Sequence, residues 1–295
     1  MKRRPVSMQA GFIARSMKYS TLCLFAIWII TSPVLAKDPP PAGKLFIIGG
    51  GSRPDAMVDR IIDEAGLRTG GYAVILPMSS EEPDSAIYYA QRQFVAKGLK
   101  NIIGLNFKKG EVLRKDKLDS VRQARLIYIS GGDQNRFMDV VRGTEIEAAI
   151  REAYQKGSVV SGSSAGAAVM SRVMITGNEL KHPDYASTFK NIEAGNIETK
   201  PGLGLLQQAI VDQHFVRRSR HNRLISAIIE FPELKGIGID ESTAILVKGN
   251  EVEVIGESQV LIYENPKRLK VVKNGKLGGK LTLTILLPGD RFNLK

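Results

Sequence analysis

The sequence predicts an α/β protein built on a doubly wound, mostly parallel sheet. Its short apolar runs do not alternate with polar residues, which indicates strands that are buried on both faces. Segments with a helical spacing of apolar residues separate these runs, and this order is typical of a parallel sheet with helices on both sides. After Thr243 the pattern changes to alternation, which predicts antiparallel strands added to the sheet edge.

The predicted elements follow one another along residues 44–295, which we interpret as a single domain. The apolar runs assigned to parallel strands are Lys44–Gly49, Tyr72–Pro77, Asn101–Leu105, Arg125–Ser130, Ser158–Ser161 and Gly236–Asp240. The segments with helical spacing are Asp55–Ala65, Ser85–Gly98, Thr144–Gln155 and Ala165–Val173. Turn residues at Lys248–Asn250, Asn274–Gly275 and Leu277–Gly279 separate the C-terminal strands.

Residues 1–36 have the pattern of a signal peptide. They contain five basic and no acidic residues, then the apolar run LCLFAIWII, and then small residues at Val34 and Ala36. The apolar run is too short to span a bilayer comfortably, and Pro33 interrupts it. We expect cleavage after Ala36, a linker over residues 37–43 and export to the periplasm or the extracellular space, with no stable membrane anchor left. An uncleaved anchor and a start at Met17 are the alternatives.

The chain that remains after cleavage would be only mildly basic. Loss of residues 1–36 lowers the formal charge of +12 by five. The remaining Lys and Arg residues are spread along the chain and are not interleaved with aromatic residues, which argues against a nucleic-acid groove. Cys23 is the only cysteine and lies in the apolar run, so the mature chain would have no disulfide and no cysteine metal site.

The segment Ser161–Ala167 contains the pattern of a nucleophile elbow. Gly162, Ser164 and Gly166 fit the spacing G-x-S-x-G between a strand and a helix. Such a turn is so tight that a Cβ on either glycine would collide with the strand or the helix. The serine hydroxyl then lies near a helix N-terminus, where backbone N–H groups can stabilise an oxyanion. The alternative is a helix cap rich in glycine and serine that has no chemical role.

A serine nucleophile needs a base, and the chain has three histidines. His182 lies in a turn and His221 in a basic stretch, whereas His214 follows the apolar run Ala209–Val211. Open α/β sheets have their sites at the carboxyl ends of the strands, which makes His214 the leading candidate. Its alternative role is purely structural.

The third member of a triad would orient this imidazole and stabilise its cation. Glu241 lies at the end of a predicted strand and suits the role. Asp240 and Asp212 also lie at strand ends, and spacing alone does not choose among the three carboxylates.

Two glycine clusters follow predicted strands. Gly49–Ser52 lacks the later glycine of a dinucleotide fingerprint and the lysine of a P-loop, so we interpret it as a tight loop under the site. The segment Ser130–Gln134 could present a second N–H toward an oxyanion near Ser164, or form a plain turn.

Taken together, these residues resemble the cyanophycinase group of serine peptidases, peptidase family S51. This group is related to the aspartyl dipeptidases and has a class I glutamine-amidotransferase-like sheet. The motifs that carry the resemblance are IIGGGS (47–52), VILPMSSEEP (74–83), YISGGDQNRF (128–137), SGSSAGA (161–167), GLGLLQQAIVDQHFVRRSRHNRL (202–224), GIGIDESTA (236–244) and PGDRFNL (288–294). Their common order along most of the mature chain is far more specific than one elbow.

The resemblance implies a role for each matching position. Ser164 would be the nucleophile, His214 the general base and Glu241 its partner, with an oxyanion hole formed by the backbone of Gly132 and Ala165. The positions implied to line the substrate pocket are Gln134, Asp212, Gln213, Arg218 and Arg223. Arginine could clamp an aspartyl carboxylate, and Asp212 could receive the guanidinium of an arginyl group.

The expected activity is therefore hydrolysis of cyanophycin, a polyaspartate with arginine side chains, or of related aspartyl peptides, through an acyl-enzyme. The family implies no metal and no cofactor, and it implies a homodimer. Two alternatives are an esterase and a catalytically silent binding protein for peptides rich in Asp and Arg. An α/β-hydrolase esterase would place its histidine late in the chain, after the acid, and here no histidine follows His221.

Overall fold

The computed structural model describes residues 40–184 and 186–295. The predicted signal peptide, residues 1–36, lies outside the described residues. In the described part, no helix combines the length and the hydropathy that a membrane span requires.

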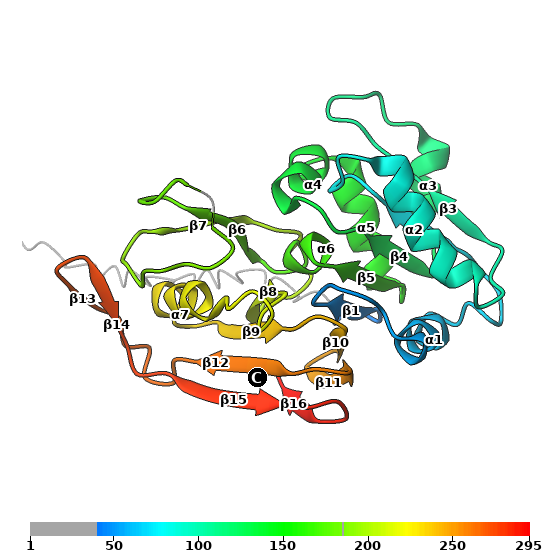
Figure 1. Ribbon diagram of the computed structural model, residues 1–295. Coiled ribbons are helices and arrows are strands. Elements are labelled where there is room, and N and C mark those ends of the chain that lie inside the picture. Colours follow the sequence, from blue (N-terminus) through cyan, green and yellow to red (C-terminus); the bar gives the residue numbers. More distant parts are fainter. Residues whose placement is uncertain (1–39, 185) are drawn as a thin grey trace, which may run out of the picture. The chain divides into compact units, whose positions relative to one another are not determined.

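The larger sheet has eight strands and is mostly parallel. Its strands are β1 (Lys44–Ile48), β2 (Ala73–Leu76), β3 (Ile102–Gly104), β4 (Leu126–Ile129), β5 (Val159–Ser163), β10 (Thr243–Lys248), β11 (Glu251–Gly256) and β16 (Arg291–Asn293). They lie in the order β16-β11-β10-β1-β5-β4-β2-β3 (Figure 1). Strands β1 to β5 run parallel, whereas β10, β11 and β16 extend the sheet in antiparallel fashion beyond β1. The predicted fold class is confirmed.

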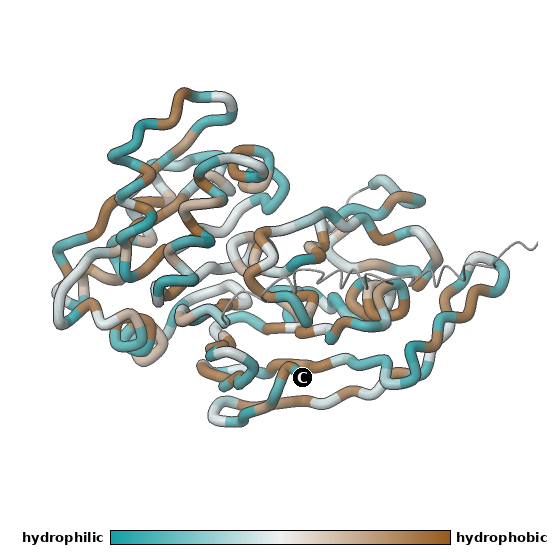
Figure 2. Tube along the Cα trace, turned by 180° about the vertical axis from the view of Figure 1, so that it is seen from behind, coloured by the Kyte–Doolittle hydropathy of each residue, from teal (hydrophilic) through white to brown (hydrophobic). Residues whose placement is uncertain are grey.

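Helices cover both faces of this sheet. On one face lie α1 (Asp55–Glu64) and α2 (Pro83–Val95); on the other lie α3 (Lys115–Arg122), α4 (Gln134–Val141), α5 (Glu145–Gln155) and α6 (Ala165–Ala168). Successive strand residues point to opposite faces, so Phe46 packs with α1 and α2 while Leu45 and Ile47 pack with the other helices. Figure 2 shows brown, hydrophobic stretches alternating with teal, hydrophilic ones along the coloured chain.

A second sheet, which the sequence analysis did not separate from the first, carries part of the site. It consists of β8 (Ala209–Gln213), β9 (Lys235–Ile239), β12 (Val260–Glu264) and β15 (Thr282–Leu286), in the order β15-β12-β9-β8. Strands β8 and β9 are parallel. The run Gly236–Asp240 therefore lies in this sheet and not in the larger one. Its lack of alternation indicates burial on both faces, and that property holds in either sheet.

Helix α7 (His221–Glu230) packs on one face of the second sheet. Leu224 and Ile228 of this helix join one core with Ile210 and Tyr263 of the strands. The opposite face, with Val211, belongs to the core of the larger sheet. No helix is predicted here from the sequence, because the arginines just before His221 make the segment a basic stretch.

Two further strand pairs lie outside these sheets. They are β6 (Val173–Glu179) with β7 (Ile197–Pro201), and the hairpin of β13 (Val271–Lys273) with β14 (Lys276–Gly278). The hairpin lies against the loop before β7, where the Leu277 N–H donates to the Ile192 carbonyl at 3.1 Å and the Ala194 N–H donates to the Gly275 carbonyl at 3.0 Å. Its turn at Asn274–Gly275 and the turn of the β10–β11 hairpin at Gly249–Asn250 lie where the sequence predicts them.

Two predicted elements are wrong in their extent. Leu277 and Gly278 form no turn, because they pair with Val272 and Val271 across the hairpin. The helix expected over Ala165–Val173 ends at Ala168. The chain turns there because the next carbonyls bond to another loop, with the Leu203 N–H donating to the Val169 oxygen at 2.6 Å.

Candidate active site

Ser164 occupies the sharp turn between β5 and α6. Its backbone has φ 55° and ψ −111°, a conformation that is costly for a residue with a side chain. The flanking glycines make the turn feasible. A Cβ on Gly162 would lie 2.5 Å from the carbonyl carbon of Gly166, and one on Gly166 would lie 2.9 Å from the carbonyl carbon of Ile129. The steric reason given above for both glycines is thus confirmed.

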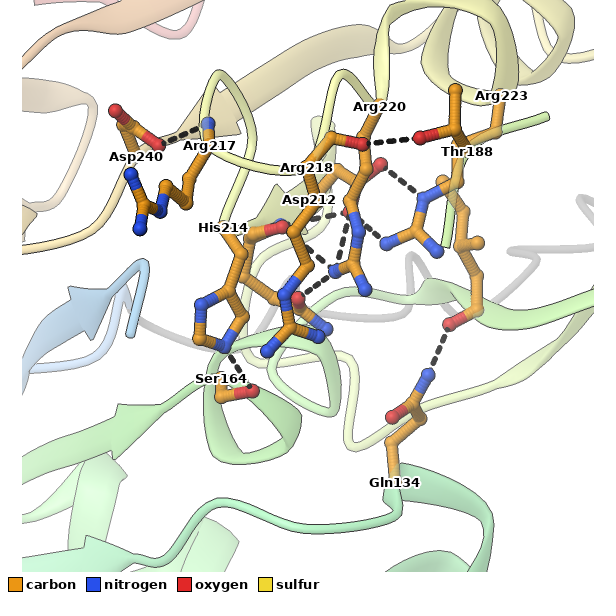
Figure 3. A network of polar contacts seen from close by, with 12 residues as sticks. Gln134, Ser164, Thr188, Asp212, His214, Arg217, Arg218, Arg220, Arg223 and Asp240 are labelled. Atoms are coloured by element: carbon orange, nitrogen blue, oxygen red, sulfur yellow. Dashed lines mark hydrogen bonds and ion pairs between the residues drawn. The ribbon is translucent and has the colours of Figure 1, made fainter. Parts of the chain in front are cut away.

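His214 follows the last residue of β8 and faces Ser164. Its Nε2 lies 2.9 Å from the Ser164 Oγ, although the two residues are 50 positions apart. The residue has φ 49° and is 8 % exposed, so the ring is held among protein atoms. Figure 3 shows the imidazole directed at the hydroxyl.

Glu241 lies behind this ring. Its Oε1 is 2.6 Å from the His214 Nδ1, on the side opposite Ser164. The adjacent parallel strands β8 and β9 explain the contact, since each of the two residues follows one of their carboxyl ends.

The two competing carboxylates have other partners. Asp240 accepts hydrogen bonds from the Arg217 N–H at 2.9 Å and from the Ser258 hydroxyl at 2.8 Å. Asp212 contacts Arg223. Of the three carboxylates that the sequence left open, Glu241 is the one hydrogen-bonded to His214.

The surroundings hold the pKa of His214 below its ordinary value. Burial is the largest cause, because it disfavours the imidazolium. The hydrogen bond to Glu241 acts in the opposite direction, while the charges of Arg218 and Arg220 lower the pKa further. The imidazole is therefore neutral near neutral pH, which is the state that a general base requires.

Backbone N–H groups lie close to the hydroxyl. Ala165 is the first residue of α6, and the first N–H groups of a helix have no partner within it. On the other side of Ser164 lies the loop after β4, where a Cβ on Gly131 would be 3.5 Å from the Ser164 Cβ. Gly132 has φ +136° and passes so close to Ser79 that a Cβ would lie 2.6 Å from the Ser79 carbonyl carbon. Of the two predicted oxyanion residues, Ala165 follows Ser164 in the chain, and Gly132 lines the same cavity as Ser164.

A cavity of about 310 Å³ opens beside Ser164. The residues that line it are Gly132, Asp133, Gln134, Asn135, Ser164, Thr176, Gly177, Asn178, Gln213, Arg218, Arg220 and Arg223. The lining is polar and carries three arginines against one carboxylate. Such a cavity suits a polar, negatively charged ligand next to the hydroxyl.

Comparison with known proteins identifies the family of this chain. The sequence profile of peptidase family S51 matches residues 45–255. The chain belongs to this family.

Several relatives of this S51 peptidase are cyanophycinases. The chain is 34 % identical to the cyanophycinase of Geminocystis herdmanii over 239 residues, which cover 77 % of this chain and 84 % of the relative. It is 31 % identical to the cyanophycinase of a Nostoc species, over 86 % of this chain and 87 % of that one. The crystal structure of a peptidase from an acI-B1 actinobacterium shares the fold with a TM-score of 0.63 at 22 % identity, covering 85 % of this chain and 96 % of that one.

Asp212 takes a different place in this S51 peptidase from the one expected. It is 1 % exposed, and both carboxylate oxygens face Arg223, with 2.6 Å between the Arg223 Nε and the Asp212 Oδ2. The carboxylate is thus already occupied and does not line the cavity. Its observed contacts hold Arg223, which itself lines the cavity, and leave no open position for a guanidinium of the substrate.

Arg220 lines the cavity too, and the sequence analysis did not select it. Its Nη1 donates to the Gln213 carbonyl at 2.7 Å and also contacts the Gln213 side chain. Arg218 extends from the same loop, and in Figure 3 its side chain points toward Ser164 alongside His214. The run RRSR at 217–220 shows that several arginines lie close together in the sequence. No sequence rule tells which of them line the cavity and which lie on the surface.

Gln134 begins α4 and closes the far side of the cavity. Its amide Nε2 donates to the carbonyls of Ile175 at 3.0 Å and Thr176 at 2.6 Å, which fixes the side chain against β6 (Figure 3).

The other two histidines lie away from the cavity. His182 contacts Glu193 at 2.9 Å, and His221 contacts the Tyr263 hydroxyl at 2.8 Å. Within residues 40–184 and 186–295, no group of three His, Cys, Asp or Glu side chains could hold a metal ion.

Proposed function

We propose that this chain is an exported serine peptidase that hydrolyses cyanophycin or closely related aspartyl peptides through an acyl-enzyme. The single observation that carries the proposal is the continuous series of hydrogen bonds from the Ser164 Oγ through the imidazole of His214 to Glu241, beside an arginine-lined cavity. Nucleophile, base and orienting carboxylate in this geometry form the arrangement that acyl transfer requires.

In the first step, the Ser164 Oγ attacks the carbonyl carbon of the scissile peptide bond, and its proton passes to the His214 Nε2. The carbonyl π pair moves onto oxygen, and the N–H groups of Gly132 and Ala165 stabilise that oxyanion. The carbonyl then re-forms and the C–N bond breaks, while the imidazolium gives its proton to the leaving amine. The Glu241 carboxylate holds the Nδ1–H and stabilises the cation.

In the second step, a water molecule replaces the amine. His214 takes a proton from this water as it attacks the acyl carbonyl, and the same N–H groups hold the second oxyanion. Collapse releases the carboxylic acid and returns the proton from the imidazolium to the Ser164 Oγ. The neutral imidazole that burial favours is needed at the start of both steps.

The charges of the cavity favour an acidic group beside the scissile bond. Arg218 has an exposed side chain and no ion-pair partner among the described residues, so it is free to clamp an aspartyl carboxylate. Arg223 is held by Asp212 and offers its remaining donors from a fixed position. The cyanophycinase relatives act on the polymer that their name states, and we extend this substrate to the present chain.

The test is incubation of the purified protein with cyanophycin and, separately, with isoaspartyl dipeptides, followed by mass spectrometry of the products. We expect release of β-Asp-Arg dipeptide by the native chain and none by Ser164→Ala. Undiminished release by that variant would eliminate the mechanism. Cleavage of the isoaspartyl dipeptides but not of cyanophycin would show that isoaspartyl peptides are the substrate.

Export rests on the charged, then apolar, then small-residue order of residues 1–36. We propose that the signal peptide is removed and that the enzyme acts on polymer or peptides outside the cytoplasm. N-terminal sequencing of the protein recovered from the periplasm or medium should then begin at Lys37. Recovery with an intact N-terminus in the cytosol would contradict this part of the proposal.

We further propose that the enzyme is a homodimer in which β15 contacts a second copy. Strand β15 is an edge of its sheet, and Leu283 and Ile285 on the strand and Leu287 just after it expose 51 %, 58 % and 54 % of their surface. Exposed apolar edge strands tend to be covered by another chain. Sedimentation should show a dimer that Ile285→Lys converts to a monomer; a native monomer would overturn this proposal.

A further inference from the structure

We propose that the segment Ile48–Gly51, which follows β1, is the positioning element that sets the three reactive side chains against one another. This inference rests on the proposed serine peptidase mechanism. The sequence alone indicates only a tight loop at these glycines. In the structure, each residue of this segment contacts a loop that carries Ser164, His214 or Glu241.

Three successive carbonyl groups of the segment accept one backbone hydrogen bond from each of these loops. The Ile48 oxygen accepts from the Ser164 N–H at 3.1 Å. The Gly49 oxygen accepts from the His214 N–H at 2.7 Å. The Gly50 oxygen accepts from the N–H of Ser242, the residue after Glu241, at 2.9 Å. One short stretch of backbone therefore holds all three loops.

The missing side chains of the glycines matter as much as the hydrogen bonds. A Cβ on Gly49 would lie 2.7 Å from the Ile239 carbonyl carbon, at the end of β9. A Cβ on Gly50 would lie 2.5 Å from the Nε2 and 2.8 Å from the Nδ1 of His214. A Cβ on Gly51 would lie 2.8 Å from the Cβ and 3.2 Å from the Oε2 of Glu241. The imidazole and the carboxylate thus rest directly on the glycine backbone.

Each residue that donates to the segment has a positive φ: 55° at Ser164, 49° at His214 and 53° at Ser242. Conformations of this kind persist only where the surroundings hold them in place. The need for such an element follows from the architecture, because the nucleophile follows a strand of the larger sheet while base and acid follow strands of the second sheet. Strand β1 belongs to the larger sheet, and its glycine loop bonds to both sets.

Gly50→Ala tests the contact with the imidazole. The matched control is Gly157→Ala, since Gly157 has φ +114° against +119° at Gly50 but no atom within 4 Å of its Cβ position. Both variants place an alanine at nearly the same positive φ, and only the first meets the ring. We expect kcat to fall on the order of 100-fold in Gly50→Ala, the cost of a displacement of about 1 Å in a reacting group. KM should stay within about threefold of the native value, because Gly50 does not line the cavity.

A second readout needs no substrate. The proton shared between the His214 Nδ1 and the Glu241 Oε1, 2.6 Å apart, should give a strongly downfield resonance in the proton NMR spectrum. We expect this resonance in the native chain and in Gly157→Ala, and its loss in Gly50→Ala. Its absence from His214→Ala assigns it.

A second matched pair covers the case in which Gly50→Ala does not fold. Gly51→Ala has φ +70° and meets Glu241, whereas the control Gly143→Ala has φ +71° and no atom within 4 Å. We expect kcat to fall about tenfold in the first and to stay within about twofold in the second, because the Glu241 side chain can shift in part.

These results separate the two proposals. Folded Gly50→Ala or Gly51→Ala variants with native kcat and an intact downfield resonance would overturn the positioning role. Equal losses in a glycine variant and its matched control would overturn it too, since backbone strain would then be the whole cause. Full activity of Ser164→Ala would instead overturn the proposed function, and the NMR comparison would still decide whether the glycine segment orders the histidine.

Discussion

The two halves of the site are built in different ways. Ser164 lies between β5 and α6, and the glycines that shape its turn are its neighbours in sequence. His214 and Glu241 are 27 residues apart and meet only because β8 and β9 pair in a second sheet. The half with the proposed nucleophile is thus encoded locally, whereas the half with the proposed base and acid depends on tertiary structure. We expect the two halves to respond differently to substitution.

The largest effect should come from the nucleophile itself. Ser164→Ala should lower kcat by about 10⁴- to 10⁶-fold, as removal of a triad member does elsewhere. The unfolding free energy should change by less than about 1 kcal/mol. Steady-state kinetics and urea denaturation measure the two quantities.

The control for this variant is Ser161→Ala, three residues earlier in β5. The Ser161 hydroxyl is buried and has no hydrogen-bond partner among the described residues, so its removal should leave kcat unchanged. An equal loss in both variants would show that β5 matters for the fold and not for the nucleophile.

Glu241→Gln should lower kcat by about 10⁴-fold, because the imidazole loses the partner that fixes its tautomer and stabilises its cation. Burial lowers the pKa of His214, and the Glu241 hydrogen bond opposes that effect. The acid limb of the kcat/KM profile should therefore lie below the ordinary histidine value of about 6.5 in the native enzyme and lower still in the variant. Asp240→Asn is the matched control, and an upward displacement of the limb would contradict this assignment.

Substitution of the buried pair of Asp212 and Arg223 tests how much this pair contributes to the free energy of unfolding in the half of the site that contains His214 and Glu241. Arg223 is 2 % exposed, so Arg223→Met would leave a buried carboxylate with reduced compensation. We expect the unfolding free energy to fall by about 3–5 kcal/mol. The double variant with Asp212→Asn should regain part of this loss, and denaturant titration of all three chains measures it. No loss in the single variant would mean that the pair contributes little.

The smallest effect is expected at Glu64, the last residue of α1, which contacts Lys44 at the amino end of β1, the end opposite the glycine segment. Burial alone would raise the pKa of Glu64, but hydrogen bonds from Lys248, Lys44 and Arg60 lower it to about 2. A lowered pKa means that the folded state favours the carboxylate, so this stabilisation is complete above pH 4.5 and disappears as the pH falls toward 2. Glu64→Gln should cost about 1–2 kcal/mol at pH 7 after solvent screening, with kcat unchanged. A loss of activity would show that the two ends of β1 are coupled.

The same contrast explains what the sequence could reveal. Ser164 was predictable because strand, turn and helix are contiguous and the glycine spacing has a steric cause. His214 followed from its place after an apolar run. The choice of Glu241 over Asp240 and Asp212 depended on the family resemblance, since spacing does not show which strand ends adjoin.

Other features could not be predicted because their cause is tertiary. The run Gly236–Asp240 lies in a second sheet, and burial on both faces is the same signal in either sheet. Arg220 lies in a basic run where pattern does not separate cavity from surface. The contacts of Gly50 with His214 join residues from two sheets, so no local rule reveals them.

The most direct test of the central claim is labelling by a small serine-directed fluorophosphonate, with the modified peptide identified by mass spectrometry. The account predicts a single adduct on the peptide that contains Ser164, formed at least 100-fold more slowly in His214→Ala, because the hydroxyl then lacks its base. An adduct on another residue, or an equal rate in His214→Ala, would contradict the claim that these two side chains act together.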